Sequence, residues 1–565
     1  MKEAKALLKA YFGYEDFRPG QEEMVTDILA GRDVLAVMPT GAGKSICYQL
    51  PALILPGVTI VISPLISLMV DQVRALNAAG IHAAYINSAL TDAQIVRALS
   101  YAARGRYDLV YVAPERLSTP EFMTFAMTTD ICLIAVDEAH CISQWGQDFR
   151  PGYKRIHDFV ISLPKRPVVA AFTATATKRV QDDIAMSLHL QDPGLLVTGF
   201  DRPNLYFALV RPADKIAWLI TDMAGHREET SIIYCSTRKK VEEVYEVLRE
   251  EGLSVGRYHA GMEAEDRARS QEDFITDRTR VMVATNAFGM GIDKPDVRRV
   301  IHFNMPQSME NYYQEAGRAG RDGEEAEALL LVDGQDYVIA RYLLEHKDYP
   351  EGMTGAEILT AQDRDLDRLR FMERYTRTGK CLRSYILRYF GEKPQGECGK
   401  CSNCCRAEEE AGAAAGEREP ISEPRAHLTG IGWDDLTAVA ADSDDFMHGD
   451  RKRKDHPGGG TGIAGSGTYH SHLQALDIRR VVAPEGDGFS DEDRELLRRL
   501  DDLRKEIAGE NGVAPYMICN LRTLKEICRR RPGNRAQMLE LPGMTETKYD
   551  NFGWRFFKLL SEAED

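Results

Sequence analysis

Short apolar runs alternate with segments of helical periodicity from residue 33 to residue 332. The nine runs are DVLAVM (33–38), TIVISPL (59–65), DLVYVAP (108–114), ICLIAVDE (131–138), PVVAAFTAT (167–175), TSIIYC (230–235), RVMVATN (280–286), RVIHFN (299–304) and EALLLV (327–332). They are continuously apolar instead of alternating, which is typical of parallel strands buried on both faces of a sheet. Nine strands are more than one open sheet usually holds. The pattern therefore predicts two α/β lobes with a cleft between them, joined near DRPNLYF (201–207).

The chain changes character after the second predicted lobe. Residues 345–405 carry a helical pattern followed by clustered cysteines, and residues 406–488 include the linker-like stretch HPGGGTGIAGSGTY. A helical stripe begins after Asp491 and consists of Leu496, Leu497, Leu500, Leu503 and Ile507. The expected segments are 1–203, 204–344, 345–405, 406–488 and 489–565.

The composition of the 565 residues favours a globular protein without a membrane span. Apolar residues make up 44% of the chain, yet no run reaches the 18 consecutive apolar residues that a spanning helix needs. The first residues lack a continuous apolar signal core, so a cytoplasmic protein is expected. The net charge of −16 is an average over domains, and the basic runs RKRK (451–454) and CRRRPGNR (528–535) leave nucleic-acid binding open.

MPTGAGKS (38–45) follows the first apolar run and precedes a helical pattern. Glycines in such a turn let backbone N–H groups wrap phosphates at a helix N-terminus. Lys44 is expected to reach the β- and γ-phosphates, and the Ser45 hydroxyl to bind Mg²⁺. Met38 stands where the strict pattern has glycine, so this is a variant P-loop; the alternative is an ordinary glycine-rich turn. The predicted phosphate-binding residues are Thr40, Gly41, Ala42, Gly43, Lys44 and Ser45.

Two further segments carry groups suited to phosphoryl transfer. Asp137 ends an apolar run, where a second Mg²⁺-directed carboxylate belongs, and Glu138 beside it could orient or deprotonate an attacking water. QEAGRAGR (314–321) places Arg318 and Arg321 one helical turn apart, so both can face a γ-phosphate. Taken alone, Asp137 and Glu138 could instead be a surface acidic pair, and Arg318 and Arg321 could instead lie on a solvated helix.

Together these segments resemble the RecQ family of superfamily 2 helicases. The similar motifs, in family order, are FGYEDFRPGQ (12–21), SPLISLMVDQV (63–73), YVAPERL (111–117), FTATAT (172–177), YHAGM (258–262) and ATNAFGMGIDKPDVR (284–298). The resemblance runs almost continuously from Leu7 to Cys404. It implies two tandem RecA-like lobes with parallel sheets and ATP as the nucleotide. It also implies nucleotide contacts by Tyr14, Arg18 and Gln21 at the adenine, and by His140 and Gln314.

CISQWGQDFRPGY (141–153) resembles the aromatic-rich loop of the RecQ family. In the family this loop lies where single-stranded DNA crosses the ATPase cleft, and aromatic rings stack on bases of any sequence. The resemblance implies DNA contacts by Gln144, Trp145, Phe149, Arg150 and Thr285. A core position for Trp145 is the alternative, although its polar neighbours disfavour burial.

Four cysteines, Cys381, Cys398, Cys401 and Cys404, form the pattern C-x16-C-x2-C-x2-C. Thiolates at this spacing can close a tetrahedral Zn²⁺ site, and the pattern matches the zinc module of the RecQ family. Cys405 is an alternative fourth ligand, and free buried thiols are the alternative to a metal site.

The last 75 or so residues resemble a small all-α HRDC domain, an accessory DNA-binding module. LPGMTETK (541–548) could present backbone amides to phosphates near Lys548, and a protein-contact role is the alternative. RecQ proteins usually carry a winged helix before this domain, whereas residues 406–488 suggest only a reduced one. We therefore expect unwinding of long or blunt duplexes to be weak relative to the ATPase rate.

The motifs thus predict an ATP-dependent DNA helicase of RecQ type, and the family resemblance implies that it moves 3′ to 5′ on single strands and acts in recombination and repair. Its expected cofactors are ATP, Mg²⁺ and Zn²⁺. Expected partners are single-stranded and tailed or branched duplex DNA, together with repair and single-strand-binding proteins, in a bacterial-type cytoplasm at the nucleoid. The alternatives are an RNA-dependent DExH ATPase and a DNA-binding or annealing scaffold with weak unwinding.

Overall fold

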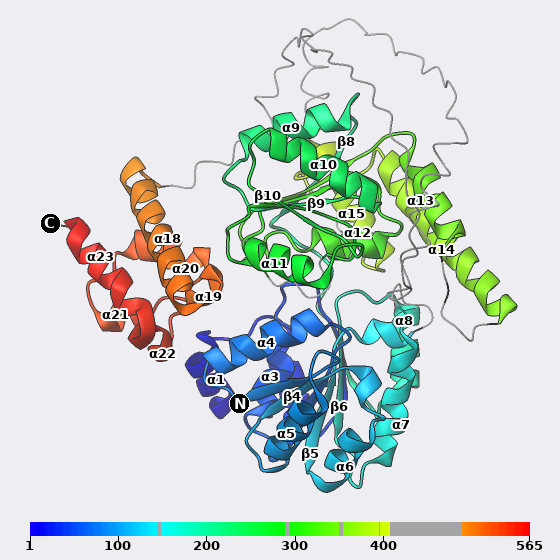
Figure 1. Cartoon of the computed structure of the whole chain (residues 1–565), viewed down its shortest axis with the longest axis vertical. Coiled ribbons are helices and arrows are strands. Elements are labelled where there is room, and N and C mark those ends of the chain that lie inside the picture. The colour runs from blue at the N-terminus through cyan, green and yellow to red at the C-terminus, as the bar shows by residue number, and fades with distance from the viewer. Residues whose placement is uncertain are drawn as a thin grey trace, which may run out of the picture.

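The computed structural model describes residues 1–143, 149–288, 294–347, 349, 354–394, 396–406 and 489–564. Figure 1 shows two α/β lobes, one coloured blue to cyan and the other mainly green, with a separate helical unit coloured orange to red beside them. The predicted fold class, two RecA-like lobes with parallel sheets followed by helical parts, is confirmed.

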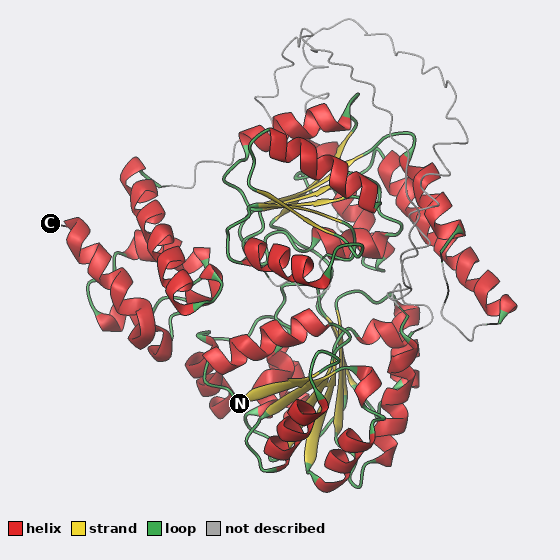
Figure 2. Ribbon diagram, viewed as in Figure 1, coloured by secondary structure: helices red, strands yellow, loops and turns green. Residues whose placement is uncertain are grey.

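The first lobe is built on a seven-stranded sheet with the order β3-β4-β2-β5-β6-β1-β7, in which all neighbours are parallel. Its strands are β1 (Val34–Val37), β2 (Val58–Ile62), β3 (Ala83–Ile86), β4 (Leu109–Val112), β5 (Ile131–Val136), β6 (Val168–Thr173) and β7 (Gly194–Val197). Its longer helices are α1 (Lys2–Leu7), α2 (Gln21–Leu29), α3 (Ile46–Ala52), α4 (Ile66–Ala78), α5 (Asp92–Ala103), α6 (Pro120–Thr128), α7 (Arg155–Ser162) and α8 (Lys178–Ser187). Helices flank both faces of the sheet in Figure 2.

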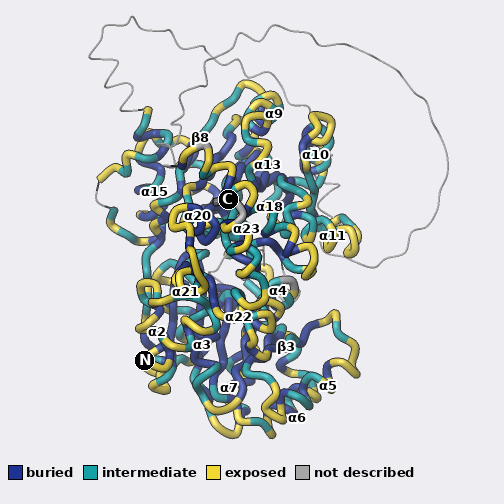
Figure 3. The backbone as a smooth tube through the Cα atoms, turned by 90° about the vertical axis from the view of Figure 1, so that its left-hand side faces the viewer, coloured by how far each residue is buried: buried dark blue, intermediate teal, exposed yellow. Residues whose placement is uncertain are grey.

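The second lobe repeats this plan with a six-stranded parallel sheet of order β10-β11-β9-β12-β13-β8. Its strands are β8 (Leu205–Val210), β9 (Ser231–Tyr234), β10 (Val255–Tyr258), β11 (Val281–Ala284), β12 (Arg299–His302) and β13 (Ala326–Leu331). Its helices are α9 (Lys215–Gly225), α10 (Arg238–Glu250), α11 (Ala264–Ile275), α12 (Met309–Ala316) and α13 (Asp336–Glu345). The central strands β1, β2, β9 and β11 are fully buried, and Figure 3 shows buried backbone in the interior of both lobes with exposed backbone at the periphery.

All nine predicted strands are present, and the structure adds β3, β7, β8 and β10. These four are the two edge strands of each sheet. DRPNLYF therefore holds more than a joint, because its last residues begin β8. Only some of these strands lack an apolar run: β8 reads LYFALV and is continuously apolar, whereas Gly256 and Arg257 interrupt the pattern in β10.

Helices α14 (Gly355–Arg377) and α15 (Leu382–Tyr389) follow the second lobe, and α14 lies beside α13 in Figure 1. The C-terminal unit consists of α18 (Asp491–Asn511), α19 (Pro515–Ile518), α20 (Leu521–Arg530), α21 (Arg535–Leu539), α22 (Glu546–Lys548) and α23 (Trp554–Glu564). Helix α18 starts with a capping box between Ser490 and Asp493 and ends at Gly512, whose φ is 63°. Leu496, Leu500 and Ile507 of the predicted stripe are buried in the core of this unit.

The C-terminal unit contacts both lobes. The Gly543 N–H donates to the Gly13 carbonyl of the first lobe at 3.1 Å, and Lys525 pairs with Glu324 of the second lobe. Within the segment LPGMTETK, the Gly543 amide is therefore engaged by protein. In the part of the chain that the structure describes, no helix combines the length and apolar character needed to cross a bilayer.

The five segment boundaries stay predictions. Of the proposed linker, only Arg406 is described, so residues 407–488 and any reduced winged helix within them lie outside the described residues.

Candidate active site and metal centre

The predicted P-loop lies between β1 and α3, as expected from its sequence. Gly41 and Gly43 have φ values of 81° and 80°, which other residues rarely adopt, and Ser45 is the N-cap of α3. Lys44 donates from Nζ to the Met38 carbonyl at 3.1 Å, so its ammonium group folds back over the loop. The loop is therefore shaped by backbone conformation to surround an anion.

The segment predicted to recognise adenine is fastened to this loop. The Gln21 amide, which is 1% exposed, donates from Nε2 to the carbonyls of Ala42 and Gly43 at 3.2 and 3.0 Å. Arg18 donates to the Gly41 carbonyl and lies over the Tyr14 ring, 5.9 Å from its centroid. A β-carbon on Gly43 would lie 2.5 Å from Gln21 Nε2, so a larger residue would displace the Gln21 amide from the loop and would also strain the backbone at φ of 80°.

Asp137 and Glu138 follow β5 at the edge of the sheet that carries the P-loop. Burial and the neighbouring Glu138 carboxylate raise the pKa of Asp137, against the opposing charge of Lys44. Burial also opposes ionisation of Glu138, but His140, Lys44 and Arg318 outweigh it and lower the pKa of that carboxyl. Glu138 has a left-handed backbone with φ of 47°, an uncommon conformation for a non-glycine residue. The Glu138 carboxylate is thus held ionised in a strained turn. A cation bound beside Asp137 would favour the ionised form of the Asp137 carboxyl as well.

A line of polar side chains leads from Glu138 to the second lobe. His140 Nδ1 lies 3.3 Å from Glu138 Oε2 and 2.9 Å from the hydroxyl of Thr173. The Thr173 hydroxyl donates to the Thr175 carbonyl at 3.3 Å, and Gln314 of the second lobe donates to the Thr175 hydroxyl at 3.1 Å. His140 and Gln314, both predicted site residues, are therefore linked through two threonines.

Arg318 and Arg321 lie in the turn after α12, because that helix ends at Ala316. The expectation of a helix running through both arginines is wrong, yet the turn brings them to the P-loop. Thr40 donates from its hydroxyl to the Gly317 carbonyl at 3.1 Å, and a β-carbon on Gly41 would lie 3.4 Å from the Arg321 Cα. We name residues 317–321 the arginine loop.

The predicted DNA-contacting residues fall partly outside the described part of the chain, which omits Gln144 and Trp145. Both ends of that loop are held. Ser143 donates to Asp183 at 2.5 Å, and Arg150 donates from Nη1 to the Pro64 carbonyl at 3.1 Å. Phe149 is half-buried under the Lys154 ammonium group. Thr285 is buried after β11, and its hydroxyl has no hydrogen-bond partner among the described residues.

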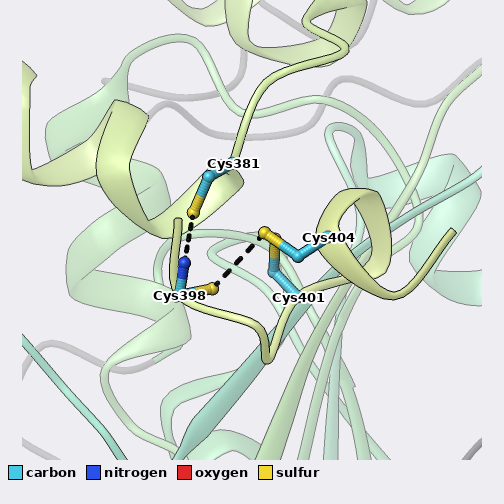
Figure 4. A group of neighbouring side chains, drawn as sticks. All are labelled: Cys381, Cys398, Cys401 and Cys404. Atoms are coloured by element: carbon cyan, nitrogen blue, oxygen red, sulfur yellow. Dashed lines mark hydrogen bonds between the residues drawn. The ribbon is translucent and has the colours of Figure 1, made fainter. Parts of the chain in front are cut away.

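Cys381, Cys398, Cys401 and Cys404 converge so that their sulfur atoms all lie within 4.8 Å of one another (Figure 4). Cys381 caps α15, and its sulfur accepts from the N–H groups of Ser384 and Cys398 at 3.4 Å. Cys405 is not part of this group, which favours Cys404 as the fourth ligand. Four sulfur atoms at these distances, with N–H groups directed at them, fit one tetrahedral zinc ion.

The cysteine group also touches the second sheet. Cys401 forms a parallel β-bridge with Phe207 of β8, and the Leu209 N–H donates to the Ser402 hydroxyl at 3.1 Å. The cysteine segment thus continues the sheet at its β8 edge.

Comparisons with known proteins agree with this geometry. Four family models match: "DEAD/DEAH box helicase" at 18–184, "Helicase conserved C-terminal domain" at 214–323, "RecQ zinc-binding" at 334–405 and "HRDC domain" at 493–560. The ATP-dependent DNA helicase RecQ of Bacillus subtilis is 40% identical over 587 residues, which cover 98% of each chain. The chain belongs to the RecQ helicase family.

One further similarity supports the family, and another concerns the fold. The ATP-dependent DNA helicase RecQ of Haemophilus influenzae is 36% identical, with 99% of this chain and 96% of that one covered. The crystal structure of the DUF1998 helicase MrfA bound to DNA superposes with a TM-score of 0.50 at 19% identity, covering 60% of this chain and 52% of that one. At this identity the second similarity concerns the fold alone.

Sequence reasoning missed one group in this RecQ chain. Arg202 lies between the two lobes and donates to carbonyls of the P-loop and of the arginine loop. The sequence of DRPNLYF indicates only a joint, because an arginine whose partners are backbone carbonyls leaves no signature at the partner positions. Thr173 and Thr175 belong to the motif FTATAT, which by itself indicates no role for their hydroxyl groups.

Proposed function

We propose that this chain is an ATP-dependent DNA helicase that couples ATP hydrolysis to 3′-to-5′ movement on single-stranded DNA and to duplex unwinding in recombination and repair. The observation that carries the proposal is the contact between the P-loop and the arginine loop, where Thr40 donates to Gly317 across the two lobes. A nucleotide held at that contact would have phosphate-binding groups on both sides, as phosphoryl transfer at a lobe interface requires.

ATP would bind with its phosphates on residues 40–45 and its base near Tyr14, Arg18 and Gln21. Ser45 and Asp137 are the residues that would hold Mg²⁺, which supplies charge neutralisation at the phosphates. Glu138, kept ionised by His140 and Lys44, can accept a proton from the attacking water. Arg318 and Arg321 would stabilise the charge that develops on the γ-phosphate.

DNA would contact the segment from Gln144 to Arg150 and Thr285. Arg150 reaches the Pro64 carbonyl, so a shift of this segment on DNA binding would be felt at the end of β2, next to β5 and Asp137. The buried Thr285 hydroxyl is available for a polar contact in the second lobe. The line from Glu138 to Gln314 would connect the second lobe to the reacting groups.

Zinc would have a structural role, because all four thiolates of the cysteine group would be used as ligands and no position would stay open for substrate. The group lies at the β8 edge of the second lobe, whereas the P-loop belongs to the first lobe.

ATPase assays with single-stranded DNA, with RNA and with no nucleic acid test the proposal. Strong stimulation by DNA is expected, and preferential stimulation by RNA would favour an RNA-dependent ATPase. Strand displacement on 3′-tailed, 5′-tailed and blunt duplexes tests the direction of movement. Opening only of the 3′-tailed duplex is expected, and binding without any hydrolysis would favour a scaffold role.

A further inference from the structure

Arg202 occupies the segment between β7 and β8, where the chain crosses from one lobe to the other. Its side chain is 8% exposed, and the guanidinium makes four hydrogen bonds to backbone carbonyls. One nitrogen, Nη1, donates to Thr40 and to Gly317, both at 3.1 Å. The other, Nη2, donates to Ala319 at 2.9 Å and to Gly320 at 3.0 Å.

These contacts join parts of both lobes that carry predicted ATP-binding residues. The Thr40 carbonyl belongs to the P-loop, and the other three acceptors belong to the arginine loop on either side of Arg318. The two loops are already in close contact, because a β-carbon on Gly317 would lie 2.4 Å from the Thr40 hydroxyl. A planar guanidinium presents its donors in a fixed fork, so it fixes the relative position of its acceptors in a way that a lysine cannot.

The neighbouring residue Asn204 shows what a contact within one lobe looks like. Its amide donates to the carbonyls of Gly320 and Glu324, both at 2.8 Å and both in the second lobe. Asn204 can therefore hold the arginine loop on its own sheet, but it does not connect the loop to the P-loop. Of these two residues, Arg202 is the one whose hydrogen bonds reach both lobes.

Positive charge accumulates around this contact. Burial lowers the pKa of Arg202, and the guanidinium groups of Arg321 and Arg18 lower it further, against the opposing effects of Tyr313 and Asp322. Like charges gathered beside a P-loop repel one another unless an anion lies among them. A polyphosphate bound beside these guanidinium groups would reduce their mutual repulsion and so stabilise the contact between the lobes.

We infer that Arg202 is a positioning residue for ATP hydrolysis, which clamps the P-loop carbonyl of Thr40 to the arginine loop and so places Arg318 and Arg321 when the lobes close. It acts through backbone and does not touch the nucleotide. The inference rests on the proposed ATPase function. It adds a residue that fixes the position of the P-loop relative to the arginine loop.

The test uses the full chain with Arg202→Lys and Arg202→Gln, and Arg298→Lys as the matched control. Arg298 donates to carbonyls of Pro295, Asp296 and Glu325 and pairs with Asp322, so it holds the base of the same loop from within the second lobe. Measured quantities are the ATP dissociation constant, the kcat of DNA-stimulated ATPase, the thermal melting temperature, and the radius of gyration with and without a non-hydrolysable ATP analogue.

For Arg202→Lys we expect kcat to fall by about 100-fold, as a misplaced catalytic group can cause. The ATP dissociation constant should stay within about threefold, since the lost interaction acts mainly in the transition state. The non-hydrolysable ATP analogue should decrease the radius of gyration of the wild type and of Arg298→Lys but should leave that of Arg202→Lys unchanged. In a double-mutant cycle, Arg321→Ala should lower kcat by a much smaller factor in the Arg202→Lys background than in the wild type.

Three results would overturn the inference. The first is a wild-type kcat in both Arg202 variants together with a normal decrease in radius of gyration on binding the analogue. The second is a melting temperature of both variants far below that of Arg298→Lys, which would make Arg202 a folding residue, and the third is additive losses of kcat in the double-mutant cycle. A wild-type chain that shows no DNA-stimulated hydrolysis would instead refute the proposed function, so the two failures are distinguishable.

Discussion

The Gln314 amide of the second lobe donates a hydrogen bond to the Thr175 hydroxyl of the first lobe, with 3.1 Å between Nε2 and Oγ1. Thr175 is 4% exposed, and it follows Thr173, which contacts His140. Gln314 lies on α12, one turn before the arginine loop. The pair therefore connects the acidic residues after β5 with the arginines that face them.

Replacing this hydroxyl should weaken the coupling between the lobes. Thr175→Val keeps the branched shape but removes the acceptor for Gln314, so kcat of DNA-stimulated ATPase should fall by about tenfold, or ~1.4 kcal/mol. Nucleotide binding should be retained, because the P-loop is unchanged. Thr221→Val, on an exposed face of α9, is the control and should match the wild type. Equal kcat in both variants would contradict the coupling.

Zinc content separates the roles of neighbouring cysteines. Cys401→Ser removes a member of the four-sulfur group, so the purified protein should lose bound zinc and about 4 kcal/mol or more of unfolding free energy. Cys405→Ser should keep the metal and its stability, because Cys405 lies outside the group. Elemental analysis and thermal melting provide the measurements. Zinc loss in Cys405→Ser with retention in Cys401→Ser would reverse the assignment.

The aromatic loop should couple DNA to hydrolysis. Trp145→Ala should keep ATP affinity and most DNA affinity, while DNA-stimulated ATPase and unwinding fall by about tenfold or more, or at least ~1.4 kcal/mol. Lys44→Ala should abolish hydrolysis with and without DNA. Thermal melting of Trp145→Ala distinguishes a core position, whose loss typically costs roughly 3–5 kcal/mol. A folded Trp145→Ala variant whose ATPase is stimulated by DNA as strongly as the wild type would show that Trp145 does not couple DNA binding to hydrolysis.

Docking of the C-terminal unit should depend on Gly13. A β-carbon there would lie 2.9 Å from the Gly543 Cα, so Gly13→Ala should release this unit from the first lobe and increase the radius of gyration. Gly105→Ala is a matched control, because its φ of 67° imposes a comparable backbone strain of about 1 kcal/mol but nothing lies within 4 Å. Equal scattering curves for the two variants would show that this contact does not hold the unit in place.

The sequence was sufficient for the inner strands and insufficient for the edges of both sheets. The nine predicted strands include every central one, because residues buried on both faces must be apolar. At the edges the requirement relaxes: Val255–Tyr258 of β10 are all half-buried, and Leu195 and Val197 of β7 are 48% and 43% exposed. Their pattern therefore does not stand out from a loop.

The candidate site divides in the same way. P-loop, acidic and cysteine residues are recognisable because phosphate and metal binding require particular side chains at particular spacings. The contacts between lobes are not recognisable, since Arg202 binds carbonyls 115 to 162 residues away and any residue supplies a carbonyl. The turn after α12 was also missed, because the spacing of Arg318 and Arg321 suits a helix as well as a tight turn.

The β-bridge between Phe207 and Cys401 has a consequence for solubility. With the cysteine segment in place, part of the β8 edge is covered, and the Leu209 N–H is satisfied by Ser402. An uncovered edge strand is a template on which another chain can add a strand. Removing the metal with a chelator would loosen this cover, so the metal-free protein should associate into oligomers through β8 and eventually precipitate. The cysteine group then acts as a safeguard against aggregation as well as a source of stability.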